Sequence, residues 1–191
     1  MIDAPWRPLA VTLAVAVACT RLIPEEHRLL NFAAAGAVAL FAAARMGLTT
    51  AIAVAVGGML LSDLLLWQAS GRNADYLPMP SVYLGLAGYL VVGRLLRRTE
   101  NPVFVGSGAV AGSVWFFAVT NFASWLAQAL PYGYSFAGLV DCFRQGLPFY
   151  RGTVTGDLVF SGVLFGAHAV LARLVRPAEL KPVAVTVEDG R

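Results

Sequence analysis

Charged side chains are scarce in this 191-residue chain: they make up 13% of it, against roughly 25% in a typical soluble domain. Apolar residues make up 58%, and the mean hydropathy is +0.69. A folded chain of this composition has too few polar groups to cover a surface in water, and a disordered chain would be more polar and more charged. The composition therefore excludes both classes and indicates an integral membrane protein.

Cysteine and histidine are also rare, with two of each. Two cysteines are too few for a disulfide framework, and His27 and His168 are not spaced as metal ligands. The sequence contains no phosphate-binding Gly-x-x-x-x-Gly-Lys-Ser/Thr loop, no Gly-x-Ser-x-Gly elbow and no His-Glu-x-x-His motif. We therefore expect no resident cofactor or metal and no enzyme activity, and any ATP hydrolysis would belong to another chain.

Apolar runs of suitable length predict six membrane-spanning helices. The runs are Pro8–Ile23, Leu29–Ala44, Thr49–Trp67, Pro80–Leu96, Val103–Leu130 and Gly152–Leu174. Residues 101–140 carry no charge and offer one long span or two short ones; the turn signal Pro131-Tyr132-Gly133-Tyr134 favours one. The aromatic, glycine-containing stretch Ser135–Tyr150 is predicted to be an interfacial or re-entrant loop.

The predicted fold is therefore all-α: a single transmembrane domain of six helices at residues 1–175, followed by a polar tail at 176–191. With six spans, nine basic residues fall on the side of the termini and five on the other side. This excess predicts a multi-pass protein of the cytoplasmic (inner) membrane with both termini in the cytoplasm. The net charge of +3 does not indicate nucleic-acid binding, because the basic residues lie at the ends of apolar runs.

Small residues recur every four positions in the first run, at Ala10, Ala14 and Ala18. Such a strip lets another helix approach closely. It serves either packing within the bundle or docking of a partner membrane protein, and the sequence leaves both open.

Short motifs in a fixed order also carry a family resemblance. They are Arg21-Leu22-Ile23-Pro24, Asn31-Phe32-Ala33-Ala34-Ala35-Gly36-Ala37, Leu61-Ser62-Asp63, Thr120-Asn121-Phe122, Leu147-Pro148-Phe149 and Gly156-Asp157-Leu158. With the helix 1 strip, the chain resembles the substrate-binding S components of energy-coupling-factor vitamin transporters, and an uncharacterised bacterial membrane protein family grouped near them. The resemblance implies an S-component-like bundle whose alanine strip docks on a coupling transmembrane subunit driven by ATPases. It also implies a substrate site near the outer side, under the loops after helices 1, 3 and 5.

Two carboxylates fall within predicted spans, Asp63 and Asp157. An ionisable group at that depth costs about 2.5–3.5 kcal/mol on insertion scales, so each is a candidate site residue. Each carboxylate either binds a ligand that carries an amine, amide or cation, or pairs with an arginine such as Arg21, Arg144 or Arg151 to fix helix packing.

Further candidate ligand-binding residues surround these carboxylates: Trp67, Tyr83, Asn121, Trp125, Cys142 and Arg144. Asn121 and Trp125 are four residues apart and share a helix face, which suits a heterocyclic molecule, although such an Asn also bridges helices. Trp67 is also explained as an interfacial anchor. Cys142 lies in the Tyr132–Tyr150 segment, the expected lid; it is either inert or a soft ligand to a metal centre such as the cobalt of a corrinoid.

The sequence thus predicts a membrane-embedded subunit that binds a small vitamin-like or heterocyclic molecule for uptake. Its expected partners are that molecule, membrane lipid and a coupling subunit with ATPases. One alternative is a membrane enzyme that acts on a lipid or isoprenoid with Asp63 and Asp157. The other is a structural partner of further membrane chains.

Overall fold

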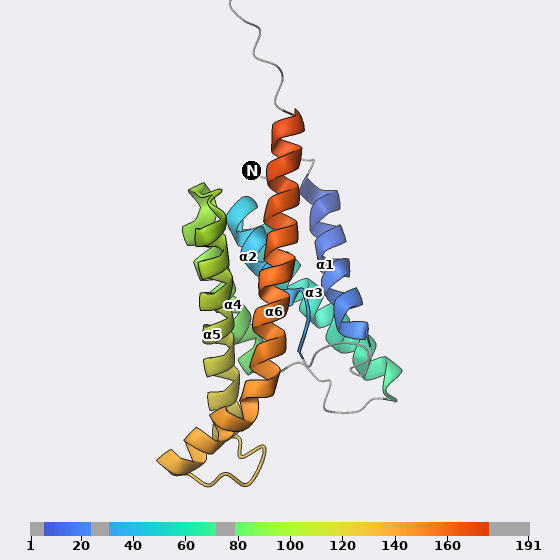
Figure 1. Cartoon of the computed structure of the whole chain (residues 1–191). Helices are drawn as coiled ribbons and strands as arrows, with labels where there is room; N and C mark the ends of the chain where they lie inside the picture. The colour runs from blue at the N-terminus through green and yellow to red at the C-terminus, as the bar shows by residue number, and fades with distance from the viewer. Residues whose placement is uncertain (1–5, 24–30, 72–78, 176–191) are drawn as a thin grey trace, which may run out of the picture.

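The computed structural model of the protein describes residues 6–23, 31–71 and 79–175, and these ranges are helical without strands (Figure 1). The elements are α1 (Trp6–Leu22), α2 (Ala35–Arg45), α3 (Leu48–Ala69), α4 (Pro80–Leu95), the short 3-10 helix η3 (Leu96–Arg98), α5 (Pro102–Leu126) and α6 (Phe136–Val175). The start of α1 and the end of α6 lie at the same end of the bundle. The predicted all-α fold is confirmed, while the tail predicted at 176–191 lies outside the described residues.

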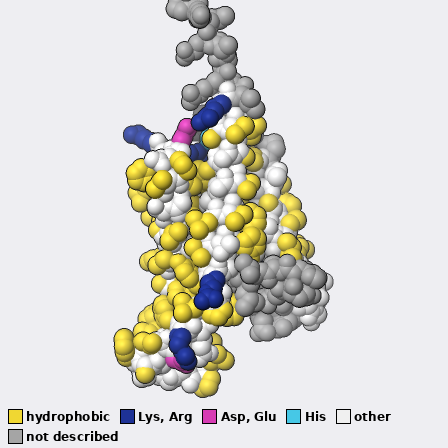
Figure 2. Space-filling view, viewed as in Figure 1, with side chains coloured by type: hydrophobic (Ala, Val, Ile, Leu, Met, Phe, Trp, Pro, Cys, Tyr) yellow, Lys and Arg dark blue, Asp and Glu magenta, His cyan; other side chains and the backbone are white. Residues whose placement is uncertain are grey.

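Three of these helices, α3, α5 and α6, are long and apolar enough to cross a membrane. Much of their apolar surface is not covered by the protein: Leu64 is 54% exposed, Val103 70% and Val163 61%. Figure 2 shows apolar side chains along the length of the bundle and Lys or Arg side chains near its two ends. This surface suits lipid rather than water. α1 and α4 are shorter, at 17 and 16 residues.

The span predicted at Leu29–Ala44 is wrong in its extent. α2 has 11 residues and begins at Ala35, so it is about 16 Å long, half of the roughly 30 Å hydrocarbon core. Residues 36–44 are all buried, and α2 packs against each of the other five α-helices. A fully enclosed short helix is as apolar in sequence as a lipid-exposed span, which explains the error. Because α2 is so short, the other helices extend beyond its N-terminal end, and the cavity described below lies there.

Residues 101–140 contain one helix long and apolar enough to cross a membrane, as predicted, but α5 ends at Leu126 rather than Leu130 and residues 136–140 begin α6. Asn101 caps α5 by accepting the backbone N–H of Val103 on its Oδ1 atom at 2.9 Å, and Pro102 occupies the first helical position. The helix ends at Leu126, and the predicted turn at 131–134 follows it.

The loop predicted at Ser135–Tyr150 is wrong, because this stretch forms the first part of α6. Ser135 begins the helix: its Oγ atom accepts the N–H of Gly138 at 3.1 Å. Pro148 lies inside the helix, and Figure 1 shows α6 bending in this region, as a missing backbone donor explains. The prediction rested on the aromatic residues and glycines of the stretch, which a helix also accommodates.

Arg45 ties the C-terminal end of α2 to the turn after α4. Its Nη1 atom donates to the carbonyl of Leu96 at 3.3 Å and its Nη2 atom to that of Thr99 at 2.7 Å. The guanidinium carbon also lies 5.0 Å from the centre of the Phe165 ring. One side chain therefore joins α2, η3 and α6 at the end of the bundle where the termini lie.

Replacing Arg45 by methionine is expected to lower the free energy of unfolding by about 2–3 kcal/mol, because it leaves part-buried carbonyl groups without a charged donor. Arg144→Met is the matched control: Arg144 is exposed and pairs with Asp141 on the same helix, so its loss should cost less than about 1 kcal/mol. Thermal unfolding of the detergent-purified variants measures both. Equal costs would contradict the role given to Arg45.

Candidate functional site

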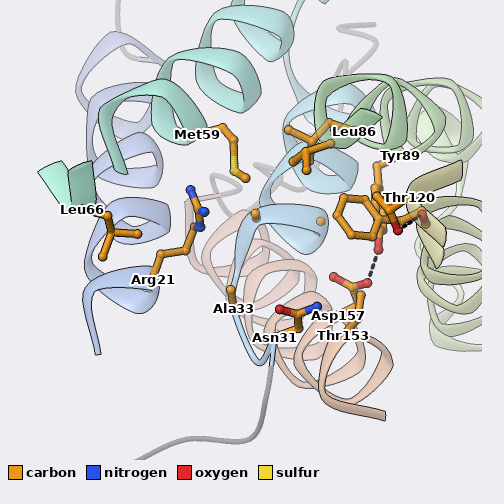
Figure 3. A pocket seen from close by; sticks show the side chains of 14 residues that line it. Arg21, Asn31, Ala33, Met59, Leu66, Leu86, Tyr89, Thr120, Thr153 and Asp157 are labelled. Carbon is orange, nitrogen blue, oxygen red and sulfur yellow. Dashed lines mark hydrogen bonds between the residues drawn. The ribbon is translucent and has the colours of Figure 1, made fainter. Parts of the chain in front are cut away.

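A cavity of about 280 Å³ lies at the N-terminal end of α2, toward the end of the bundle opposite the termini (Figure 3). All six α-helices or the segments next to them contribute to its wall. The lining residues are Arg21, Asn31, Ala33, Ala35, Gly36, Met59, Leu66, Val82, Leu86, Tyr89, Phe116, Thr120, Thr153 and Asp157. The wall is mostly apolar, with a few polar groups on separate helices, as in many small-molecule sites.

The carboxylate of Asp157 forms the polar centre of one wall. It is 1% exposed, and its Oδ2 atom accepts hydrogen bonds from the Tyr89 hydroxyl group and, at 2.6 Å, from the Ser113 hydroxyl group. The carboxyl group also interacts with the backbone amide of Ala37, in the first turn of α2. α2 has no side-chain cap of its own, so Asp157 supplies the negative charge that a helix N-terminus favours.

Tyr89 is held against this carboxylate by two glycines. A side chain at Gly36 in α2 would overlap both Asp157 and the Tyr89 ring, and one at Gly112 in α5 would overlap the same ring. The ring is 1% exposed. The absence of side chains at these two positions therefore sets where the Tyr89 hydroxyl group and the carboxylate meet.

A second polar cluster joins α1, α3 and α4. Arg21 forms an ion pair with Asp63 and donates a hydrogen bond to Ser62, and the Tyr83 hydroxyl group donates to Asp63 Oδ2 at 2.8 Å. Asp63 is 5% exposed. Its pairing with Arg21 matches the packing alternative, although Arg21 also lines the cavity.

The other predicted candidates lie apart from the Asp157 wall. Asn121 and Cys142 line an adjacent cavity of about 360 Å³, which shares Asn31 and Thr120 with the first. Cys142 is buried, and its thiol donates to the Asn121 carbonyl at 3.3 Å. Part of this cavity's wall, including Leu130 and Tyr132, comes from the turn between α5 and α6; this turn and the first part of α6 replace the predicted lid loop.

Five predicted site residues line neither cavity: Asp63 and Tyr83 of the second cluster, and Trp67, Trp125 and Arg144. Trp125 donates its indole N–H to the Gly133 carbonyl at 3.1 Å and packs against Tyr134, so it holds the α5–α6 turn. Arg144 is exposed and pairs with Asp141. Trp67 is half-buried near the end of α3.

Two of the three alanines of the α1 strip lie inside the bundle, with Ala14 against α3. Ala18 is 3% exposed, and a side chain at Gly58 would come within 3.1 Å of the Ala14 carbonyl oxygen. These contacts match packing within the bundle for Ala14 and Ala18; the side chain of Ala10 lies outside the description. The same helix exposes Val11 and Val15 instead, at 65% and 46%. Docking of a partner on α1 stays a prediction.

The sequence reasoning missed Tyr89 and Ser113, and it considered Arg21 only as a partner for an acid. One signal was available for Tyr89: Gly108 and Gly112 are four residues apart in α5, a spacing that indicates close helix approach. Nothing in the sequence, however, indicated that the approaching side chain would be a tyrosine.

The arrangement supports binding more readily than paired acid–base chemistry. Asp63 and Asp157 belong to different hydrogen-bond networks, each with its own tyrosine. Within the described ranges no three His, Cys, Asp or Glu side chains gather as metal ligands would.

A family of unknown function, DUF6580, matches residues 4–180. No match was found among curated proteins or among solved structures.

Proposed function

The chain belongs to DUF6580, a family of unknown function, and we propose from its site that it is a membrane-embedded subunit. In this proposal the subunit binds a small vitamin-like or heterocyclic molecule for uptake. One observation carries the proposal: the buried, hydrogen-bonded Asp157 forms part of the wall of a largely apolar cavity. A polar group of this kind inside a membrane bundle is costly and is typical of a substrate site.

The orientation of the bundle supports uptake from outside the cell. Described arginines are more numerous at the end of the bundle that holds the termini: Arg45, Arg94, Arg97, Arg98 and Arg173 against Arg21, Arg144 and Arg151. By the positive-inside rule this end faces the cytoplasm. The cavity then lies in the outer half of the membrane, as in the S components that the sequence resembles.

In this proposal, a separate coupling module with ATPases supplies the energy for uptake. Its contact surface is best tested on α1 at Val15, which is exposed, rather than at Ala14, where a larger side chain would disturb the packing against Gly58. If α1 docks the module, Val15→Trp should reduce uptake while ligand binding by the purified chain stays unchanged. Loss of both would indicate damage to the bundle instead.

Depletion of a defined mixture of vitamins and heterocycles from the medium tests the proposed function. Cells that produce the wild-type chain should deplete at least one component faster than cells without it. Asp157→Asn should abolish the difference, while Asp141→Asn, which removes an exposed carboxylate, should preserve it. Identical depletion with and without the chain would contradict a role in uptake.

A further inference from the structure

We propose that the ligand carries one positive charge on a protonated nitrogen and that Asp157 is its counter-ion. This inference rests on the proposed function and narrows the class of molecule that the cavity takes. It assigns different roles to the two carboxylates within the bundle, Asp63 and Asp157, for which the sequence predicts the same alternatives.

The charge balance of the cavity wall carries the argument. Arg21 and Asp157 are the charged residues among the lining side chains. Arg21 is already paired with Asp63, so these two charges offset each other. Asp157 has hydrogen-bond donors, but no Lys, Arg or His side chain within the described ranges forms an ion pair with it. Hydrogen-bond donors and the N-terminal end of α2 therefore face the Asp157 charge, but no cationic side chain among the described residues pairs with it, and a bound cation would stabilise it further in this low-dielectric environment.

The two carboxyl oxygens have different neighbours. Both side-chain hydrogen bonds, from Tyr89 and Ser113, go to Oδ2. Oδ1 lies against the start of α2, where a side chain at Gly36 would overlap it, and the carboxyl group also interacts with the backbone amide of Ala37. A ligand N–H group that reaches the carboxyl group from the cavity would add a charge-assisted hydrogen bond to these contacts.

The surrounding wall suits the rest of such a molecule. Tyr89, which donates to the carboxylate, packs against Phe116 with ring centres 6.3 Å apart, and aromatic rings also attract cations. Met59, Val82 and Leu86 add an apolar surface for an uncharged ring or chain. An anionic ligand would instead face the Asp157 carboxylate at short range, and a neutral one would add no counter-charge to it.

Three probes of one size and different charge test the inference: benzylamine, benzyl alcohol and benzoate, titrated to millimolar concentration into the purified full-length chain in lipid nanodiscs. Benzylamine should bind and should bind more tightly than the other two. Asp157→Asn should weaken benzylamine binding about tenfold or more, since it removes a charge-assisted contact, and should leave benzyl alcohol unchanged. Asp141→Asn is the control, because it removes the same charge from an exposed position.

Ser113→Ala is a second test of the inference that can be used if Asp157→Asn does not fold. It removes one donor to Oδ2 and preserves the carboxylate charge, so the preference for benzylamine over benzyl alcohol should persist. Equal binding of the three probes, a preference for benzoate, or unchanged benzylamine binding in Asp157→Asn would overturn the cation assignment while leaving a ligand cavity in place. If none of the probes binds, both this inference and the proposed function lose support.

Discussion

A methyl group added at position 36 is expected to lower the affinity of the cavity for its ligand about a hundredfold. In Gly36→Ala the new atom would overlap the Asp157 carboxylate and the Tyr89 ring, so at least one of them has to move. Both are buried in a tightly packed interior that offers little room. Displacing a charged hydrogen-bonding group costs about 2–3 kcal/mol of binding free energy, which corresponds to a loss of affinity of about a hundredfold.

The same substitution should also lower the free energy of unfolding, by about 1–3 kcal/mol for the overpacking. Gly162→Ala is the control, because a side chain there meets nothing within 4 Å. Alanine also favours a helix by about 1 kcal/mol, so the control should be neutral or slightly more stable. Calorimetric titration and thermal unfolding measure the two effects. A Gly36→Ala protein that binds as tightly as the wild type would contradict the position assigned to Asp157.

Asp63→Asn is expected to lower the free energy of unfolding by about 3 kcal/mol, because it leaves the Arg21 guanidinium without its counter-ion inside the bundle. Arg21→Met should lower the free energy of unfolding by a similar amount, because it leaves the Asp63 carboxylate without its counter-ion. The double variant has neither charge, so it should cost clearly less than the two single variants together. Thermal or denaturant unfolding of the four proteins gives the coupling energy.

The exposed pair Arg144 and Asp141 supplies the comparison for this cycle. Its side chains are 74% and 41% exposed, so their coupling should stay below about 1 kcal/mol. If the single costs of the Arg21–Asp63 pair simply add in the double variant, the two side chains do not stabilise each other, and the distinction between a paired Asp63 and a ligand-facing Asp157 fails.

The helical class, the single α5 span and the turn after it were predictable from the sequence because each has a local cause. Long apolar runs form helices, and Pro and Gly mark their ends. The short length and full burial of α2 were not predictable, because burial by five neighbouring helices and exposure to lipid select the same apolar residues. The start of α6 was missed because a stretch rich in aromatic residues and glycine is compatible both with an interfacial loop and with a helix.

The candidate site was partly predictable for a similar reason. Asp63 and Asp157 were identified because an acid in an apolar run is unusual wherever the helices lie. Their partners come from helices distant in sequence: Tyr89 is 68 residues from Asp157 and Ser113 is 44 residues away. Such pairs depend on how the helices pack, which apolar composition does not specify.

Native mass spectrometry of the protein, released gently from native membranes, tests most directly whether the ligand site exists. Native mass spectrometry should show the wild-type protein with one small molecule bound, and this adduct should persist in Asp141→Asn and Gly162→Ala but disappear in Asp157→Asn and Gly36→Ala. A wild-type spectrum that contains only the bare chain, or lipid adducts that Asp157→Asn leaves unchanged, would contradict a ligand site at Asp157.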